Sequence, residues 1–291
     1  MRGIFDRLYS KGFDFFMKKQ GKKVISVPEG NEIFCPYGMT GIAGAVCSAL
    51  GVEPPEQAEA ANPVLEAFAG GSCDRAVIYN PDAIALWLFQ KHTDIFMPVM
   101  LNTQLTLPLQ TVMPSVTPVC FATMYTGTMP EIHGIQAYRK PVVQTDSVFD
   151  ALIRAGKKPC IVATAGDSLA KIFLKRKMDY YIYDSVEEVN AKAEELIAEK
   201  KYDLITIYNG NYDSCMHKCG PEGEAAMDAL RANCAEFERL HKVIKSSCGG
   251  SRTLLAFAPD HGCHEIDGSS GSHGLYMEED MNVIHFYGIV Q

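Results

Sequence analysis

Aspartate and histidine residues suited to metal binding gather in two stretches of the chain. Asp260 and His261 directly follow an apolar run, and His273 lies twelve residues after His261. Asp213 and His217 are four residues apart, which places both side chains on one face if this segment is helical. Mixed imidazole and carboxylate donors suit Zn²⁺ or Mn²⁺ better than Ca²⁺. The residue types and spacing therefore predict a site for divalent cations.

A further acidic residue, Asp82, comes after the apolar run of residues 75–79. Open α/β sheets place their ligands at the carboxyl ends of strands, so these runs would deliver their acidic and imidazole groups to one edge. Two divalent ions need roughly four to six donors each. Singly, each residue has a simpler interpretation, because an aspartate after a strand often caps a helix and a lone histidine is usually structural. Six such residues together favour a two-metal site.

Thr117 is the candidate nucleophile. It has the form of an N-cap, with Pro118 suited to the first helical position and Gly127 to the residue past the helix end. Its hydroxyl would then lie where unpaired N–H groups and the positive end of the helix dipole favour a phosphate. Taken alone, Thr117 is more simply a helix cap. Beside a two-metal site, catalysis becomes the better interpretation.

Four motifs, in this order, resemble the alkaline phosphatase superfamily and, within it, the type I phosphodiesterase/nucleotide pyrophosphatase branch. Residues 114–134 resemble its nucleophile motif, in which Thr or Ser precedes a helix ending in Thr-Gly and a later His-Gly. Residues 213–221 are similar to its Asp-Ser-x-Gly-His-x-x-Gly-Pro signature, and residues 260–262 and 271–274 resemble its two C-terminal metal motifs.

The resemblance implies a three-layer α/β/α sandwich with a mostly parallel central sheet. It also implies two ions, zinc in the phosphodiesterase branch and manganese in the related phosphomutases. The expected ligands of the first ion are Asp82, Thr117, Asp260 and His261, and those of the second are Asp213, His217 and His273. The resemblance further implies that Thr117 attacks phosphorus and carries the phosphoryl or nucleotidyl group as a covalent intermediate.

Two departures from the family pattern stand out. Nucleotide pyrophosphatases usually carry Asn three positions after the nucleophile, where this chain has Cys120, and a thiol is a weak donor. Either Asn209, Asn211 or a backbone N–H would then hold the phosphate oxygen, or the oxyanion would be handled differently. Asp82 follows Asn-Pro rather than standing in the usual Asp-Gly context.

Composition agrees with an enzyme built as a single alkaline phosphatase-like catalytic domain over residues 1–291, with residues 1–70 as an N-terminal extension or covering region. The chain is 47% hydrophobic and 21% charged, enough to bury a substantial core. A net charge of −8 argues against binding a nucleic acid polymer and leaves a small phosphorylated substrate as the expected partner.

The sequence contains no run of about 18 apolar residues that could span a membrane, and its first residues carry charges where a signal peptide is apolar. We therefore expect a cytoplasmic protein with no membrane partner. Its ten cysteines would be reduced. A thiolate zinc site involving Cys215, Cys219 and Cys263 is an alternative, although no Cys-x-x-Cys pair is present.

Apolar periodicity predicts alternating helices and strands, typical of a parallel sheet covered on both faces. The expected helices cover residues 4–19, 40–50, 55–69, 82–91, 147–155, 185–199 and 221–246, with one more beginning at Thr117. The expected strands cover residues 23–27, 75–80, 97–101, 159–164, 179–183, 203–208, 253–258 and 282–290.

The sequence thus predicts a metal-dependent hydrolase of phosphodiester or pyrophosphate bonds. A phosphomonoesterase or phosphomutase on the same scaffold is the first alternative, which depends on whether Arg139, Lys140 or Lys218 grips extra phosphate oxygens. A non-catalytic metal-binding protein is the second alternative, disfavoured by the intact Thr117 and ligand set.

Overall fold

A seven-stranded sheet forms the centre of the protein. The computed structural model describes residues 35–291, so the expected helix 4–19 and strand 23–27 lie outside the described residues, and a single domain over 1–291 stays a prediction. The strand order is β2-β9-β6-β1-β5-β3-β4. The strands are β1 (Arg75–Pro81), β2 (Leu105–Gln110), β3 (Pro159–Thr164), β4 (Asp179–Tyr183), β5 (Leu204–Asn209), β6 (Thr253–Phe257) and β9 (Asn282–Val290).

Parallel pairing dominates this sheet, as the sequence predicts. Strand β1 is parallel to both of its neighbours, with Val77 opposite Ile205 of β5 and Leu255 of β6. Only β9 runs against its neighbours, pairing antiparallel with β6 and β2. All residues of β1, β5 and β6 are buried, because helices cover both faces of the central strands.

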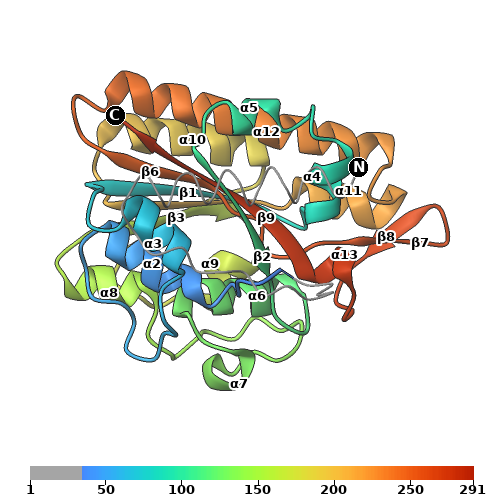
Figure 1. Ribbon diagram of the computed structural model, residues 1–291, viewed down its shortest axis with the longest axis horizontal. Coiled ribbons are helices and arrows are strands. Elements are labelled where there is room, and N and C mark those ends of the chain that lie inside the picture. Colours follow the sequence, from blue (N-terminus) through green and yellow to red (C-terminus); the bar gives the residue numbers. More distant parts are fainter. Residues whose placement is uncertain (1–34) are drawn as a thin grey trace. The chain divides into compact units, whose positions relative to one another are not determined.

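Helices form a layer on each side of the sheet (Figure 1). One layer contains α4 (Leu86–Lys91), α5 (Met97–Met100), α10 (Val186–Glu199), α11 (Asn211–Cys219) and α12 (Glu224–Ser247). The other contains α2 (Gly41–Ala49), α3 (Pro63–Ala69), α6 (Thr117–Thr126), α8 (Val148–Arg154) and α9 (Ser168–Ile172). The fold is therefore the predicted three-layer α/β/α sandwich.

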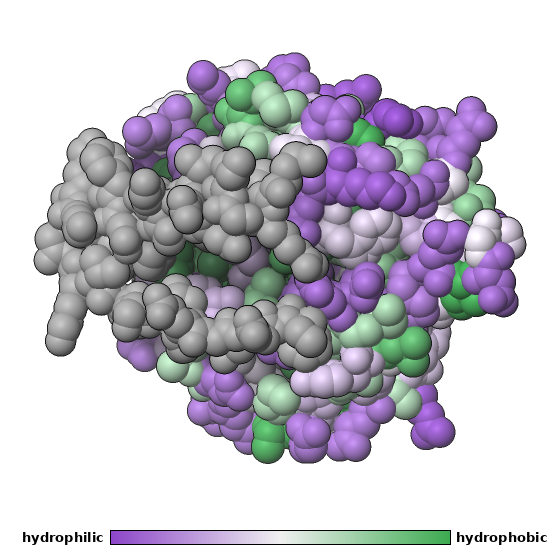
Figure 2. Space-filling view, turned by 45° about the vertical axis from the view of Figure 1, so that its right-hand side comes forward, coloured by the Kyte–Doolittle hydropathy of each residue, from purple (hydrophilic) through white to green (hydrophobic). Residues whose placement is uncertain are grey.

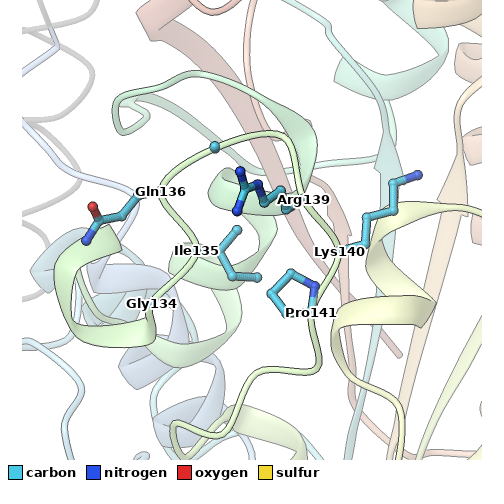
Figure 3. Close-up of a pocket in the computed structure, with 7 residues that line it drawn as sticks. Gly134, Ile135, Gln136, Arg139, Lys140 and Pro141 are labelled. Carbon is cyan, nitrogen blue, oxygen red and sulfur yellow. The ribbon is translucent and has the colours of Figure 1, made fainter.

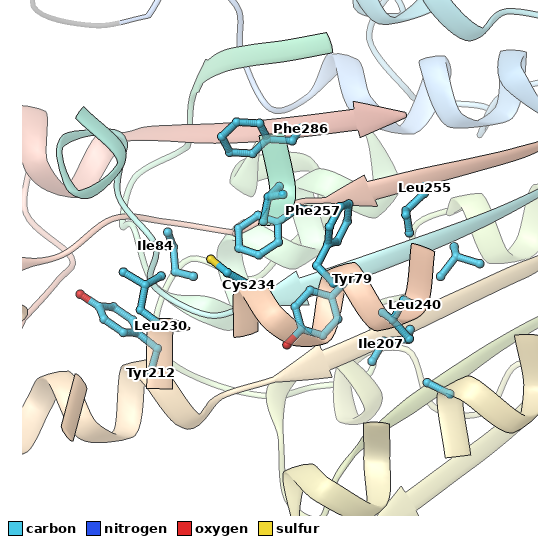
Figure 4. Packing of buried hydrophobic residues seen from close by; sticks show 14 of the residues in the cluster. Tyr79, Ile84, Ile207, Tyr212, Leu230, Cys234, Leu240, Leu255, Phe257 and Phe286 are labelled. Carbon is cyan, nitrogen blue, oxygen red and sulfur yellow. The ribbon is translucent and has the colours of Figure 1, made fainter. Parts of the chain in front are cut away.

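Phe257 of β6 lies at the centre of the core between the sheet and the first helical layer (Figure 4). Its ring lies 5.9 Å from that of Tyr79 and 5.6 Å from that of Phe237, measured between centroids. Helix α12 presents Leu230, Phe237 and other buried residues at helical spacing, while its remaining face is charged. This packing fixes the strands whose ends carry the candidate ligands.

Three expected elements differ from the structure. The expected strand 97–101 is wrong, because Met97–Met100 form the short helix α5, whose first turn accommodates Pro98. The helix expected at 55–69 begins only at Pro63, where the Asn62 side chain accepts hydrogen bonds from two backbone N–H groups. The helix expected at 82–91 begins at Leu86, because Ala83 has a left-handed backbone with φ of 63°.

Smaller elements complete the described chain. Strands β7 (His264–Ile266) and β8 (Ser270–Ser272) form a separate hairpin, and α7 (Pro130–His133) and α13 (Glu278–Met281) are single turns. The face in Figure 2 carries mainly hydrophilic residues with small scattered hydrophobic areas. Every helix within residues 35–291 is too short or too polar to cross a membrane.

Candidate active site

The candidate ligands meet at the carboxyl edge of the three central strands. Strands β6, β1 and β5 are neighbours and parallel, so their carboxyl ends lie side by side. Asp82 comes directly after β1, Asp260 and His261 come shortly after β6, and α11, which carries Asp213, begins after β5. The sheet order therefore explains why residues distant in the sequence gather in one place.

The first group consists of Asp82, Asp260 and His261, all buried. The Nε2 atom of His261 lies 3.3 Å from Asp82 Oδ1 and 3.3 Å from Asp260 Oδ2. Ligand atoms of the three residues lie within 4.8 Å of one another, which is close enough to surround one ion. We call these three residues the inner group.

The second group, Asp213, His217 and His273, is more exposed, and we call it the outer group. Asp213 and His217 lie on one face of α11, as their spacing predicts, with His217 Nε2 3.3 Å from Asp213 Oδ1. His273 follows β8 and places its Nε2 3.5 Å from the same oxygen. The rings of His261 and His273 stack at 4.1 Å between centroids, so the two groups form one continuous site.

Backbone carbonyls orient all three imidazole rings. The Nδ1 atoms of His261, His217 and His273 lie 2.9–3.0 Å from the carbonyl oxygens of Gly262, Gly271 and Ser115, respectively. If each Nδ1 carries the proton and donates it to that oxygen, each Nε2 presents a free lone pair toward the carboxylates. This is the arrangement in which histidine binds a metal ion.

Three carboxylate oxygens of the site have no hydrogen-bond donor, although they are buried. They are Asp82 Oδ1, Asp213 Oδ1 and Asp260 Oδ2. Each of these oxygens lies 3.3–3.5 Å from a histidine Nε2 atom, but none of these N···O contacts has hydrogen-bond geometry. Buried acceptors without donors are costly, and a cation bound between the groups would satisfy them. The residues present therefore fit two divalent cations.

Burial shapes the electrostatics of the inner group. Burial, followed by the nearby charge of Asp213, raises the pKa of Asp82 to about 6. Burial and the charge of Asp82 also raise the pKa of Asp260 well above its ordinary value. Two buried carboxylates this close cannot both be charged cheaply without a positive partner.

The outer group balances its own charge. Burial opposes ionisation of Asp213, yet contact with His217 and the charge of His261 hold its pKa below the ordinary value. The same contact raises the pKa of His217 to about 9. Burial and the neighbouring His261 lower the pKa of His273 to about 3, which keeps its ring neutral.

Thr117 lies beside the inner group but is not a helix cap. Its Oγ1 lies 3.3 Å from His261 Nε2 and 3.5 Å from Asp82 Oδ2. The N-cap of α6 is Val116, whose carbonyl accepts the N–H groups of Val119 and Cys120. The predicted cap at Thr117 is therefore wrong, because its hydroxyl faces the carboxylates and not its own helix. The αL residue Gly127 ends the helix as predicted.

The β7–β8 hairpin holds the outer group in place. Gly271 O contacts His217 Nδ1, and a Cβ at Gly271 would meet Met216 Sδ at 2.3 Å and Met216 O at 2.9 Å. The hairpin can thus approach α11 closely only with glycine at this position. Buried Asp280 binds both His264 at the start of the hairpin and the N–H of Leu275 after His273.

The residues proposed to replace the missing asparagine differ in their surroundings. Asn209 is fully buried, and its Nδ2 already donates to Tyr79 and Asn190, so it is not a free donor. Asn211 begins α11, and its buried Oδ1 has no hydrogen-bond partner, so its role stays a prediction. Cys120 is fully buried, and burial raises the pKa of its thiol well above the ordinary value.

Within the described residues, Arg139, Lys140 and Lys218 form no ion pair with the carboxylates of either group. Lys140 donates to Gly166 O, and Arg139 lines a hollow of about 600 Å³ within the loop of residues 134–141 (Figure 3). That hollow contains none of the candidate ligands, so it does not mark the site. Lys218 is exposed on α11. Within residues 35–291, every ion-pair contact of the site carboxylates is with a histidine.

Cysteines take no part in the groups that could hold an ion among the described residues. All ten cysteines are free thiols. Cys219 donates to the carbonyl of Cys215 within α11, and Cys263 lies fully buried beside the Tyr212 hydroxyl. These contacts give the thiolate alternative no support.

One residue that the sequence analysis did not single out touches the inner group. The hydroxyl of Tyr208, near the end of β5, donates to Asp82 Oδ2. Its signal in the sequence is only that it stands five residues before Asp213 at the end of an apolar run. Nothing in the pattern says which way this side chain points.

Known proteins match this chain in part of its sequence and in its fold. Residues 82–165 match the family of type I phosphodiesterase / nucleotide pyrophosphatase, a segment that includes Asp82 and Thr117. No curated protein matches the chain.

Solved structures share the fold at low identity. Murine ectonucleotide pyrophosphatase / phosphodiesterase 5 is 17% identical with a TM-score of 0.54, covering 66% of this chain and 58% of its own. The human protein is 18% identical with the same TM-score and coverage. Phosphonoacetate hydrolase from Sinorhizobium meliloti 1021, in complex with phosphonoacetate, is 17% identical with a TM-score of 0.50, covering 67% of this chain and 59% of its own. The chain thus spans less than two thirds of the length of these proteins.

The described residues thus share the three-layer fold of these proteins, and the family match is confined to residues 82–165.

Proposed function

We propose that this protein is a metal-dependent hydrolase that cleaves phosphodiester or pyrophosphate bonds of a small phosphorylated substrate. The observation that carries the proposal is the position of the Thr117 hydroxyl, 3.3 Å from His261 and beside two Asp/His groups with unpaired carboxylate oxygens. A nucleophile next to strong cation ligands is the arrangement needed for phosphoryl transfer at a two-metal site.

Two divalent cations would occupy the two groups. Asp82, Asp260 and His261 would hold the first, with Thr117 beside it, and Asp213, His217 and His273 would hold the second. Three imidazoles among six ligands favour Zn²⁺, and Mn²⁺ is the alternative. Bound cations supply charge neutralisation for the attacking and leaving oxygens of a phosphoryl transfer.

The residues of the chain divide the reaction into two steps. Thr117 Oγ1 attacks phosphorus, so that an Oγ1–P bond forms as the ester or anhydride P–O bond breaks. Asp82 Oδ2 is the acceptor for the proton of the Thr117 hydroxyl, because the lone pair of His261 Nε2 would be committed to the cation. Water then cleaves the Oγ1–P bond, which restores the hydroxyl and releases the phosphoryl group.

The site favours diesters over monoesters. A monoester dianion carries one more charged oxygen than a diester, and lysine or arginine usually binds such oxygens. Within residues 35–291, no lysine or arginine forms an ion pair with the site carboxylates, and Lys140 donates to a backbone carbonyl. A phosphomonoesterase or phosphomutase is therefore the second candidate.

Similar structures support a threonine nucleophile and leave a nucleotide substrate as one option. A threonine-to-alanine variant of the murine protein is described as inactive and was solved with AMP. Phosphonoacetate hydrolase has the same fold and a different small substrate. We extend the threonine role to Thr117 and take a nucleotide as one candidate substrate.

A metal-reconstituted assay with bis-aryl and mono-aryl phosphates tests this function. We expect faster cleavage of the diester, abolition by a chelator, and loss of about 10²-fold or more in Thr117→Val, which keeps the side-chain shape without the hydroxyl. Thr117→Ser is the matched control, because it retains a nucleophilic oxygen. Equal rates for the wild type and Thr117→Val would remove Thr117 from the reaction, and monoester preference would favour the second candidate.

We also propose a cytoplasmic location, on the basis of ten cysteines that all remain free thiols in this fold. Counting accessible thiols in protein isolated under alkylating conditions would test it. Disulfide-linked cysteines in the isolated protein would contradict it.

A further inference from the structure

The Tyr208 side chain reaches the inner group from the strand next to the one that carries Asp82. Asn80 of β1 lies opposite Tyr208 of β5 in the parallel register, so the tyrosine stands just before the carboxyl end of the sheet. Its hydroxyl donates to Asp82 Oδ2, and only 6% of the residue is exposed. The contact is thus a buried, charge-assisted hydrogen bond to a candidate ligand.

Packing holds the tyrosine in this orientation. Its ring meets Phe121 of α6 edge to face, with 5.6 Å between centroids and 82° between planes. A Cβ at Gly210 would lie 2.8 Å from the Tyr208 hydroxyl oxygen, so glycine at this position leaves the space that the hydroxyl occupies. Phe121 thus holds the ring, and Gly210 leaves room for its hydroxyl to reach Asp82.

The hydrogen bond gives the two oxygens of Asp82 different surroundings. Oδ2 accepts from Tyr208, whereas Oδ1 has no donor and lies 3.3 Å from His261 Nε2. Thr117 makes only a long contact of 3.5 Å with Oδ2. Because Oδ2 accepts from Tyr208, Oδ1 faces the space between Asp82, Asp260 and His261, where a cation would bind. The Thr117 hydroxyl makes no short hydrogen bond to Asp82.

We propose that Tyr208 is a positioning residue that orients Asp82 for cation binding by the inner group. The inference rests on the proposed function, because it assumes that the inner group binds a cation. Hydrogen-bond partners of metal ligands fix the direction of the ligand, and their loss typically lowers metal affinity by about 10–100-fold. Because Tyr208 acts through Asp82, we expect its loss to lower the cation affinity and kcat and to leave KM unchanged.

Calorimetric titration of Zn²⁺ into the metal-stripped full-length protein tests this role. We expect two binding events in the wild type, and in Tyr208→Phe one event weakened by about 10–100-fold with the other unchanged. Gly210→Ala should give the same selective loss, since its new methyl group displaces the Tyr208 hydroxyl. Tyr212→Phe is the matched control, because the hydroxyl of this buried tyrosine donates to Pro221 O and not to a site carboxylate.

The possible outcomes separate the two proposals. Two unchanged binding events in Tyr208→Phe would overturn the role of Tyr208 and leave the hydrolase proposal intact. Equal weakening of both events, or a matching loss in Tyr212→Phe, would show a general structural effect and would also overturn it. A wild-type protein that binds no Zn²⁺ would overturn the proposed function together with this inference. In the loaded enzyme, a raised KM in Tyr208→Phe would contradict a role through Asp82 alone.

Discussion

The inner and outer groups consist of the same residue types but differ in how their charges are compensated. In the inner group, the side chains of Asp82, Asp260 and His261 are at most 2% exposed, and burial raises the pKa of both carboxyls. In the outer group, the His217 side chain is 41% exposed, and the pair with Asp213 lowers one pKa and raises the other. Burial therefore disfavours the charged carboxylates of the inner group, whereas the outer group is partly neutralised by its own histidine.

The strands, helix and loop that carry the ligands also differ between the two groups. The inner ligands stand at the ends of β1 and β6 in the centre of the sheet, held by the aromatic core. The outer ligands stand on α11 and on a loop after β8, joined at Gly271. A buried, electrostatically costly half thus lies beside a more exposed half.

The largest expected effect is that of Asp260→Asn on activity. A ligand in direct contact with an ion should matter at least as much as its supporting residues, so we expect kcat to fall by about 10²-fold or more. Steady-state kinetics of the metal-reconstituted protein would measure it, with His285→Asn as a buried control outside both groups. Retention of more than half of the activity would contradict the assignment of Asp260.

The same substitution should stabilise the metal-free protein. Asp260 Oδ2 is buried without a donor, while Oδ1 accepts from the N–H of Ala83, a bond that asparagine can keep. Removing the charge should raise the free energy of unfolding by on the order of 1–3 kcal/mol. Urea denaturation in the presence of a chelator would show this. A destabilised variant would mean that the inner group is not under electrostatic strain.

Gly271→Ala should damage the outer group selectively. The added methyl group would overlap Met216 Sδ and Met216 O, which forces the hairpin away from α11 and removes the support of His217. Overpacking of this kind costs about 1–3 kcal/mol, and we expect only the outer cation to bind more weakly. Metal titration would check this, with the exposed Ser269→Ala of the same hairpin as control. Weakened binding of the inner cation would refute the separation of the groups.

The pH dependence of the metal-free protein should reveal the inner group. The pKa of Asp82 is raised from 3.8 to about 6 in the folded state, so folding favours its protonated form. Its contribution to stability is fully present below pH 3.8 and is lost as the pH rises through about 6. Subtracting the stability curve of Asp82→Asn from that of the wild type, in chelator, should isolate this fall. A difference that does not change between pH 3.8 and 6 would contradict it.

The smallest expected effect belongs to the outer pair. The pKa of His217 is raised from 6.5 to about 9, so its contribution is present below pH 6.5 and lost as the pH rises through about 9. Because the side chain is 41% exposed, solvent screening should limit the contribution to at most about 1 kcal/mol. Thermal unfolding of His217→Gln in chelator at pH 6 and pH 9.5 measures it. A loss much larger than this at pH 6 would place His217 in the same class as the inner ligands.

The sequence predicted the main layers and the strand ends because most strands are runs of apolar and aromatic residues. Residues 159–164, 179–183 and 282–290 form β3, β4 and β9 with the predicted bounds. It missed β2, an edge strand that contains Pro108 and only two buried positions, so it lacks the apolar signal of a strand. The helix α5 was mistaken for a strand because four residues are too few to show helical periodicity.

The sequence indicated which residue types gather at this edge of the sheet, but not where each side chain points. The i, i+4 spacing placed Asp213 and His217 on one helical face, and strand order brought Asp82 and Asp260 together. Sequence pattern could not show that Thr117 turns away from its helix, that Tyr208 points at Asp82, or that Gly271 fits against Met216. Those depend on tertiary packing between segments far apart in the chain.

The central claim is that the side chains of the inner and outer groups surround a pair of cations beside the Thr117 hydroxyl. A crystal structure of the zinc-loaded protein, with anomalous scattering measured at the zinc edge, tests it most directly. We expect two peaks about 4 Å apart, one between Asp82, Asp260 and His261 and the other between Asp213, His217 and His273. A single peak, or peaks bound by other residues, would contradict the account.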